Sequence, residues 1–196
     1  MKMLGILKQI PEALLKKYHR RVIYVPEGSI SGVDFAHDLR VTIANPRPVC
    51  LDIGANEGQT ITLLQRVFDD PTIHAFEPSH KLFQLLQSKN FGVRVSLHNV
   101  ALGKEPAKRE FINYEKSGLS SFLALDVHGE HPFRDVEVEA REVVEVETVD
   151  RFLQQNRIDT IDLLKIDTQG FDLEVLSGAT GALQAGIIRN VLVELN

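Results

Sequence analysis

The sequence has little cysteine and no long apolar run. Its one cysteine, Cys50, excludes an internal disulfide, and the apolar neighbours of Cys50 indicate a buried thiol. No stretch approaches the roughly 18 apolar residues that cross a bilayer. Lys8 and Gln9 interrupt the N-terminus where a signal peptide has its apolar core. We therefore predict a cytoplasmic protein with no integral membrane segment.

A basic block is also lacking. The 22 Lys and Arg residues are outnumbered by 27 Asp and Glu residues, which gives a net charge of −5. Such a chain has little counterion-release drive toward nucleic acid, so we expect no polyanionic partner. With 196 residues and 43% hydrophobic content, the chain can bury one core as a single domain.

Five short apolar runs alternate with helical patterns, which is typical of a parallel sheet with helices on both faces. The runs are 49–53, 72–76, 93–97, 161–166 and 191–195. The predicted fold class is α/β, with a doubly wound, mostly parallel sheet. Right-handed crossovers leave few possible sheet orders, and we expect the order 3-2-1-4-5. The chain stops one residue after the fifth run, so we expect the C-terminal strands of this fold to be missing. Ser79 is the predicted N-cap of the helix after the second run.

The alternation of strands and helices is interrupted at about 108–147, where we predict an inserted pair of strands around a polar loop. Its alternating glutamates are interpreted as a solvated face, with an acidic recognition surface as the alternative. Residues 1–48 are predicted to form a helical or extended segment packed on the core domain at 49–196. A basic amphipathic helix at 12–21 that contacts a membrane or partner is the alternative there.

The first run leads into Asp52-Ile53-Gly54-Ala55-Asn56-Glu57-Gly58. The two glycines let the chain turn sharply and bring its backbone against a ligand, and a helix starting near Gly58 presents free amides there. Glu77 closes the second run, where a carboxylate can accept two hydrogen bonds from a ribose diol. The combination favours a nucleoside cofactor over an ordinary strand-turn-helix.

Charge then discriminates between nucleoside cofactors. A dinucleotide site carries Gly-x-Gly-x-x-Gly, but here Asn56 occupies the place of the second glycine. Asp52 would repel a pyrophosphate and attract the ammonium or sulfonium of S-adenosylmethionine. We therefore predict S-adenosylmethionine. An NAD(P)-dependent oxidoreductase and a catalytically silent S-adenosyl-binding module remain as alternatives.

A second signal is the block LLKIDTQGFDLEV around the end of the fourth run. Runs one and four should be neighbours at the switch point of the sheet, where open α/β sheets bind ligands. Asp52 and Asp167 would then both project into that crevice, and a cationic cofactor would explain two converging acids. The alternative for Asp167 is a helix-capping role before Gly170.

From residue 49 to the C-terminus, the sequence resembles the FkbM-type methyltransferases. The resemblance rests on VCLDIGANEGQT, HAFEP, LHNVALG, VETVDRF and, above all, LLKIDTQGFDLEVLSGA. It implies a Rossmann-like class I methyltransferase domain that transfers a methyl group from S-adenosylmethionine. The implied acceptor is a hydroxyl of a sugar, glycan or natural-product small molecule. A homo-oligomer stays an open alternative.

The resemblance also implies site residues. The cofactor loop is matched by Asp52, Gly54, Ala55, Asn56 and Gly58, the ribose acid by Glu77, and the stretch beside the adenine by Asn99 and Ala101. The second block is matched by Lys165, Asp167, Gly170 and Glu174. Many members carry acids where this chain has the neutral Gln169 and the shorter acid Asp172.

A hydroxyl acceptor must lose its proton as it attacks the methyl group. Our hypothesis is that Asp167 or Asp172 is the base and that Lys165 tunes or orients it.

The histidines are interpreted as structural. His74, His80 and His98 lie at or near the ends of predicted strands, and a histidine base is the alternative. His128 and His131 lack companion cysteines or a clear set of carboxylates, so no metal site is predicted.

Overall fold

The computed structural model describes residues 35–115, 117–123 and 136–193. It divides the chain into two compact units, Met1–Thr42 and Ile43–Asn196. The described part of the first unit is helix α3 (Phe35–Thr42). The predicted N-terminal segment therefore lies largely outside the described residues. Within the described ranges, every helix is too short or too polar to span a bilayer.

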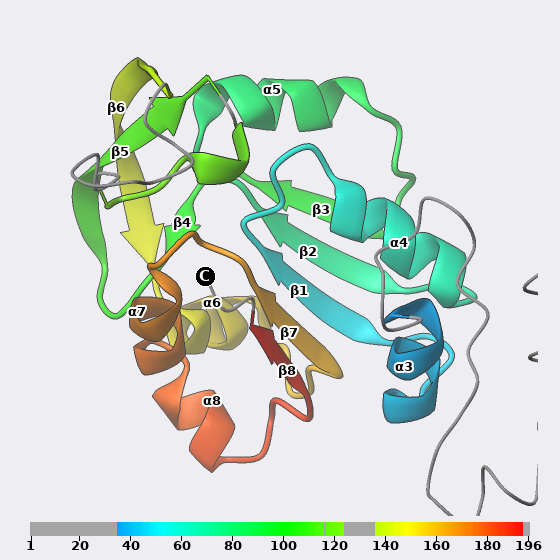
Figure 1. Cartoon of the computed structure of the whole chain (residues 1–196). Coiled ribbons are helices and arrows are strands. Elements are labelled where there is room, and N and C mark those ends of the chain that lie inside the picture. Colours follow the sequence, from blue (N-terminus) through cyan, green and yellow to red (C-terminus); the bar gives the residue numbers. More distant parts are fainter. Residues whose placement is uncertain (1–34, 116, 124–135, 194–196) are drawn as a thin grey trace, which may run out of the picture. The chain divides into compact units, whose positions relative to one another are not determined.

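The second unit is built on a parallel five-stranded sheet in the order β3-β2-β1-β7-β8 (Figure 1). Its strands are β1 (Val49–Ile53), β2 (Thr72–Phe76), β3 (Val95–His98), β7 (Leu163–Ile166) and β8 (Val191–Val193). The predicted α/β class, the parallel sheet and the strand order are confirmed. The third and fourth strands start two residues later than predicted, at Val95 and Leu163.

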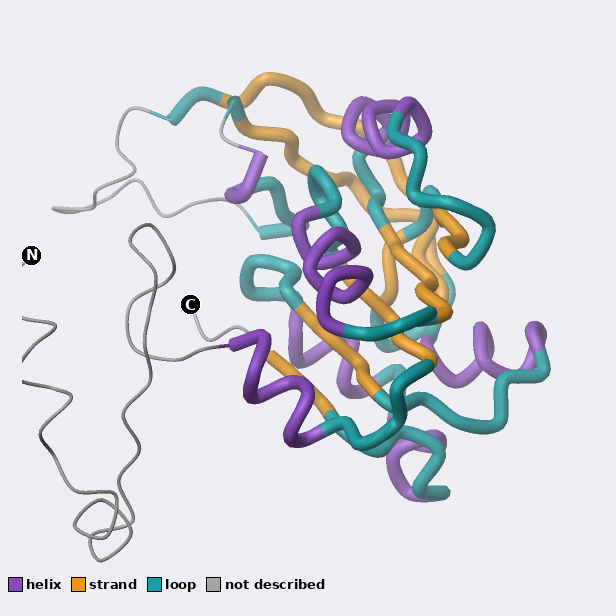
Figure 2. Tube along the Cα trace, turned by 90° about the vertical axis from the view of Figure 1, so that its right-hand side faces the viewer, coloured by secondary structure: helices purple, strands orange, loops and turns teal. Residues whose placement is uncertain are grey.

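Helices flank this sheet on both sides (Figure 2). They are α4 (Gln59–Val67), α5 (His80–Ser88), α6 (Val149–Asn156), α7 (Asp172–Ser177) and α8 (Thr180–Gln184). The connections from β1 to β3 and from β7 to β8 proceed toward opposite edges of the sheet. Because both kinds of connection are right-handed, α4 and α5 lie on one face of the sheet, and α7 and α8 lie on the other. The largest buried cluster joins Leu51, Ile53 and Leu164 of the sheet to Val149 and Val175 of the helices.

A second, three-stranded sheet occupies the stretch where the sequence predicts two inserted strands. Its strands are β4 (Ala101–Leu102), β5 (Ala107–Tyr114) and β6 (Val138–Glu147), in the order β4-β6-β5. The strands β5 and β6 pair antiparallel, and β4 runs parallel to β6. The sequence did not predict β4, because two residues are too few to show a strand pattern. The predicted polar loop with His128 and His131 lies outside the described residues.

The small sheet is fastened to α5 by charged side chains. The backbone amide of His80 donates to both carboxylate oxygens of Glu142, at 3.2 and 3.3 Å, and Lys81 forms an ion pair with Glu139. Ser79 occupies the predicted N-cap position, but its side chain makes no capping hydrogen bond. The predicted N-cap position is therefore confirmed, while the first amide of the helix is satisfied by a carboxylate from β6.

Candidate active site

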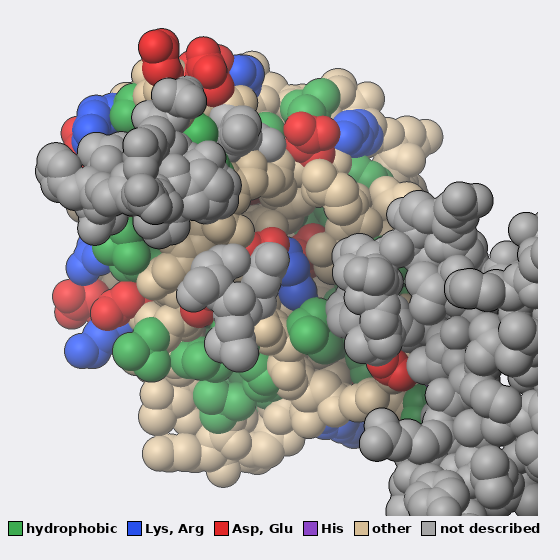
Figure 3. Space-filling view, viewed as in Figure 1, with side chains coloured by type: hydrophobic (Ala, Val, Ile, Leu, Met, Phe, Trp, Pro, Cys, Tyr) green, Lys and Arg blue, Asp and Glu red, His purple; other side chains and the backbone are tan. Residues whose placement is uncertain are grey.

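A pocket with about 590 Å³ of space, part of it open to solvent, lies at the carboxyl ends of β1, β2 and β7. The small sheet supplies its other wall. Figure 3 shows a hollow near the middle of this face, with acidic and basic side chains in it. The lining residues are Ile53, Gly54, Asn56, Phe76, Glu77, Pro78, Leu82, Val100, Ala101, Leu102, Phe111, Gly118, Ser120, Phe122, Asp167, Thr168 and Gln169. The mixed apolar and polar lining suits a small-molecule ligand.

The glycine loop after β1 brings its backbone against the end of β7. Gly54 has φ +79°, and a Cβ atom there would lie 1.9 Å from the carbonyl oxygen of Asp167. Asn56 also has a positive φ of 49°, and Gly58, with φ +86°, is the N-cap of α4. Only glycine fits position 54, because both its conformation and the approach of the Asp167 carbonyl exclude a side chain. The loop thereby forms the floor of the pocket.

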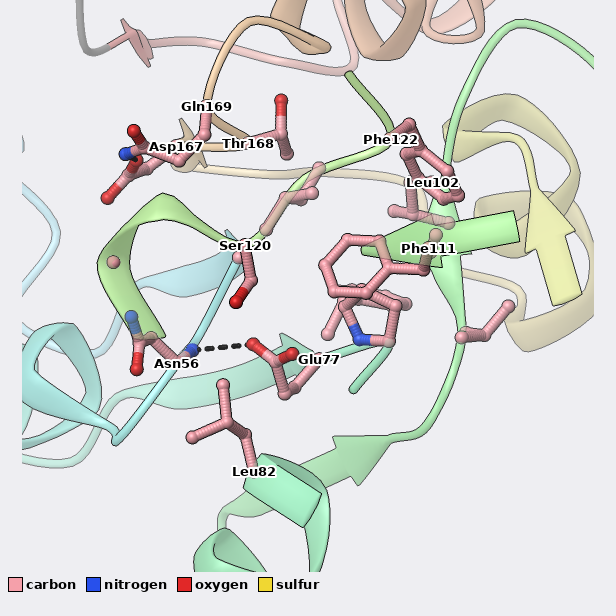
Figure 4. Close-up of a pocket in the computed structure, with 17 residues that line it drawn as sticks. Asn56, Glu77, Leu82, Leu102, Phe111, Ser120, Phe122, Asp167, Thr168 and Gln169 are labelled. Carbon is pink, nitrogen blue, oxygen red and sulfur yellow. Dashed lines mark hydrogen bonds between the residues drawn. The ribbon is translucent and has the colours of Figure 1, made fainter. Parts of the chain in front are cut away.

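Glu77 is a buried acid in this lining, and Figure 4 shows it facing Asn56. Its Oε2 accepts from the Asn56 amide at 2.8 Å, and its Oε1 accepts from the Ser79 amide at 2.9 Å. Burial raises the pKa of Glu77 to about 7, although the two backbone hydrogen bonds oppose the rise. Each carboxylate oxygen keeps a free lone pair. The side chain is therefore able to accept further hydrogen bonds from a ligand.

Asp52 lies beneath the pocket and is not part of its lining. Its side chain is 0% exposed, and its Oδ1 lies 3.1 Å from the Nζ of Lys165, its register neighbour on β7. Burial raises the pKa of the Asp52 carboxyl, and the Lys165 ammonium opposes that rise. Lys165 Nζ also donates to the Gly54 carbonyl at 3.1 Å and lies 3.5 Å from Asp167 Oδ2. The cation between the two acids is thus supplied by the chain itself.

Asp167, Thr168 and Gln169 line the pocket together (Figure 4). Asp172 is directed at the backbone of the same loop. Its Oδ1 accepts from the amide and hydroxyl of Thr168 at 2.9 and 2.8 Å, and its Oδ2 accepts from the Gly170 amide at 3.2 Å. The N-cap of α7 is Phe171 and has no side-chain capping hydrogen bond, so the helix-capping alternative for Asp167 is not observed.

The remaining predicted cofactor residues differ in their placement. Ala101 lines the pocket, whereas Ala55 is buried and lies outside the lining. The side chain of Asn99 donates to the carbonyl oxygens of Glu77 and Pro78 at 2.9 and 3.0 Å. Asn99 therefore positions the segment that carries Glu77.

The insertion carries no recognition code in the sequence, so the sequence did not identify which residues of β5 and of the segment after it line the pocket. Phe111, Phe122, Gly118 and Ser120 all line the pocket. The rings of Phe111 and Phe122 meet edge to face with centroids 5.1 Å apart, and they form an apolar wall. The C-terminal half of β5, Phe111–Tyr114, is buried on both faces, which places Phe111 against the pocket.

Other reactive groups in the described part of the chain lie away from the pocket lining. Cys50 is buried, and burial raises its pKa to about 12, which confirms a protonated, inert thiol. His74 and His98 face each other, with Nδ1 and Nε2 3.3 Å apart. No group of three His, Cys, Asp or Glu residues among the described ones is arranged to hold a metal ion.

Comparison with known proteins finds similarity over the part of the chain that forms the pocket. The family model described as the methyltransferase FkbM domain matches residues 52–196. Methyltransferase 1 of Beauveria bassiana (strain ARSEF 2860) is 31% identical over an alignment of 159 residues, and the alignment covers 74% of this chain. These residues cover 63% of that relative, so the match spans less than two thirds of its length.

Proposed function

Because this chain belongs to the FkbM methyltransferase domain family, we propose that it transfers a methyl group from S-adenosylmethionine to a hydroxyl group. The proposed acceptor is a sugar, glycan or natural-product small molecule. The observation that carries the proposal is one pocket lined by the glycine loop, by Glu77 and by Asp167 at the switch point of the sheet. Ligands of open α/β sheets bind at that point.

The chemistry of the lining fits an adenosyl cofactor. Glu77 is proposed to accept hydrogen bonds from the ribose diol, and Asn56 and Gly54 to contact the cofactor through the loop. The Asn56 Oδ1 atom is buried and has no hydrogen-bond partner in the described part of the chain. Such an atom is costly unless a ligand or water donates to it. When bound, the cofactor supplies the methyl group from its sulfonium.

Asp167 is the proposed acid of the second block. Its carboxylate lines the pocket between the Lys165 ammonium and the Gln169 amide. We assign Asp167 a position beside the positively charged methionine part of the cofactor. From this position its carboxylate accepts the proton of the acceptor hydroxyl as that hydroxyl attacks the methyl group. Asp172 is a weaker candidate for the base, because its two oxygens already accept three hydrogen bonds from its own loop.

The first test is calorimetry of the full chain with S-adenosylmethionine and S-adenosylhomocysteine, with NADH as the control ligand. We expect binding of both adenosyl ligands and none of NADH. A screen of hydroxyl acceptors with a labelled methyl group then separates an enzyme from a silent binding module. A folded chain that binds neither adenosyl ligand contradicts the proposal.

The second test compares Asp167→Asn with Asp172→Asn on an acceptor from that screen. General-base catalysis contributes about 10²- to 10⁴-fold. We expect kcat to fall by about that factor in Asp167→Asn, whereas Asp172→Asn should mainly lower thermal stability. If Asp167→Asn turns over at the wild-type rate with the cofactor bound, the base lies elsewhere.

A further inference from the structure

Gln169 is held in an unusual backbone conformation at the edge of the pocket. Its φ is 53°, in the left-handed region that a non-glycine residue seldom adopts. Such a conformation costs free energy and persists only where surrounding contacts impose it. Gln169 also lines the pocket, so the contacts that fix its conformation also affect the shape of the pocket.

The side chain of Gln169 reaches the proposed acid. Its Nε2 donates to Asp167 Oδ1 at 2.8 Å, while Lys165 Nζ lies 3.5 Å from Asp167 Oδ2. The two carboxylate oxygens are thus each engaged by a different donor. In Figure 4, Asp167 and Gln169 lie side by side along one wall of the pocket. A carboxylate held at both oxygens has little rotational freedom left.

The backbone of Gln169 is held from the small-sheet side. The hydroxyl of Ser121 donates to the Gln169 carbonyl at 2.8 Å, and Ser121 is 2% exposed. Ser121 is itself fixed, since its amide and carbonyl exchange hydrogen bonds with Ile112 of β5 at 3.1 and 2.9 Å. A continuous chain of contacts therefore runs from β5 through Ser121 and Gln169 to Asp167.

We propose that Gln169 is a positioning residue for the Asp167 carboxylate, and that Ser121 links this positioning to the small sheet. The inference rests on the proposed function, because it assumes that Asp167 lies against the bound cofactor. The neutral amide suits this task, since it donates a hydrogen bond to Asp167. A carboxylate at position 169 would repel Asp167 instead.

A double-mutant cycle on the full chain tests this, with S-adenosylhomocysteine as the probe in calorimetry. Gln169→Met keeps the length of the side chain but removes the donor, and Asp167→Ala removes the acceptor. We expect Gln169→Met to weaken binding about fivefold in the wild-type background and by less than twofold in the Asp167→Ala background. A merely structural loss at position 169 would weaken binding equally in both, because Thr168 and the rest of the lining would be disturbed in both.

Ser121→Ala should weaken binding about threefold. The matched control is Ser177→Ala, which removes an exposed hydroxyl that donates to the Leu173 carbonyl at 2.8 Å and should leave binding unchanged. Equal effects of Gln169→Met in the two backgrounds, or none in either, overturn the role of Gln169. Wild-type binding in Ser121→Ala overturns the link to the small sheet. Failure of the wild-type chain to bind the probe overturns the proposed function itself.

Discussion

At the scale of single residues, Glu77 gives the pocket a pH dependence. Burial raises its pKa to about 7, so its ionised fraction rises about tenfold between pH 6 and pH 8. A ribose diol donates to the ionised form, so binding is linked to loss of the proton. We expect the affinity for S-adenosylhomocysteine to rise about tenfold from pH 6 to pH 8, as measured by calorimetry.

Two acids serve as variant and control, Glu77 after β2 and Glu57 in the glycine loop. In Glu77→Gln, the side-chain NH₂ would face the backbone amide of either Asn56 or Ser79, so binding should weaken and its pH slope should vanish. Glu57 is an exposed acid in the glycine loop, and Glu57→Gln should keep the wild-type slope. A wild-type slope in Glu77→Gln would mean that another group titrates.

The sequence predicted Glu77, Asn56 and Asp167 as site residues, and all three line the pocket. The sequence also predicts that Asp52 lines the pocket, because Asp52 lies near the end of a strand at the switch point of the sheet. In the structure Asp52 is buried beneath the lining. The missing information was the register of β7, which sets Lys165 beside Asp52 and neutralises it inside the sheet. Positions along a strand are visible in a sequence, but pairing between distant strands is not.

At the scale of elements, the β1–α4 loop depends on the approach of β7. Gly54 and Gly92 have similar φ values, +79° and +83°, but only Gly54 has an atom in the way of a Cβ, the Asp167 carbonyl. Gly92→Ala should cost about 1 kcal/mol from the left-handed conformation alone. Gly54→Ala should cost about 3 kcal/mol or more, because overpacking against backbone adds to that. Urea denaturation measures both, and equal losses would refute the close approach.

Element boundaries were predicted well where the pattern was local. The bounds of β1 and β2 agree with the apolar runs, since prolines and polar residues delimit both. The N-cap position of α5, Ser79, was predicted from a local rule and is observed. The carboxylate that accepts from the His80 amide was not predictable, because Glu142 comes from β6 and lies 62 residues further along the chain.

At the scale of the whole molecule, the strand order was predictable from general rules for doubly wound sheets. Right-handed crossovers leave few arrangements for alternating strands and helices, and the observed order is the one predicted. The position of the small sheet over the pocket did not follow, because handedness says nothing about where an insertion docks. Its contacts through Glu142 and Ser121 are specific side-chain interactions.

The stability of the fold should depend on pH through a half-buried histidine pair, His74 and His98. His98 stacks on Phe76 with centroids 4.7 Å apart and meets Phe152 edge to face at 5.0 Å. Its ring nitrogen lies 3.3 Å from that of His74, so a proton on either ring would be poorly solvated. Burial, and then the neighbouring His74, lower the pKa of His98 to about 4. Burial also lowers the pKa of His74.

Between pH 4 and 6.5 the unfolded chain therefore binds a proton at His98 that the folded chain does not. For His98 alone, the free energy of unfolding should consequently fall as the pH drops through this window, by about 1–2 kcal/mol between pH 7.5 and pH 5. Glu77 acts in the opposite direction over most of the same window and by a similar amount, because its raised pKa favours the folded state at low pH. The difference between the wild type and His98→Phe isolates the histidine, since phenylalanine keeps the ring packing but does not titrate. Urea denaturation at the two pH values should show that acidification from pH 7.5 to pH 5 is more favourable to the stability of His98→Phe than to that of the wild type, by about 1–2 kcal/mol, and equal changes in the two proteins would exclude a contribution of His98.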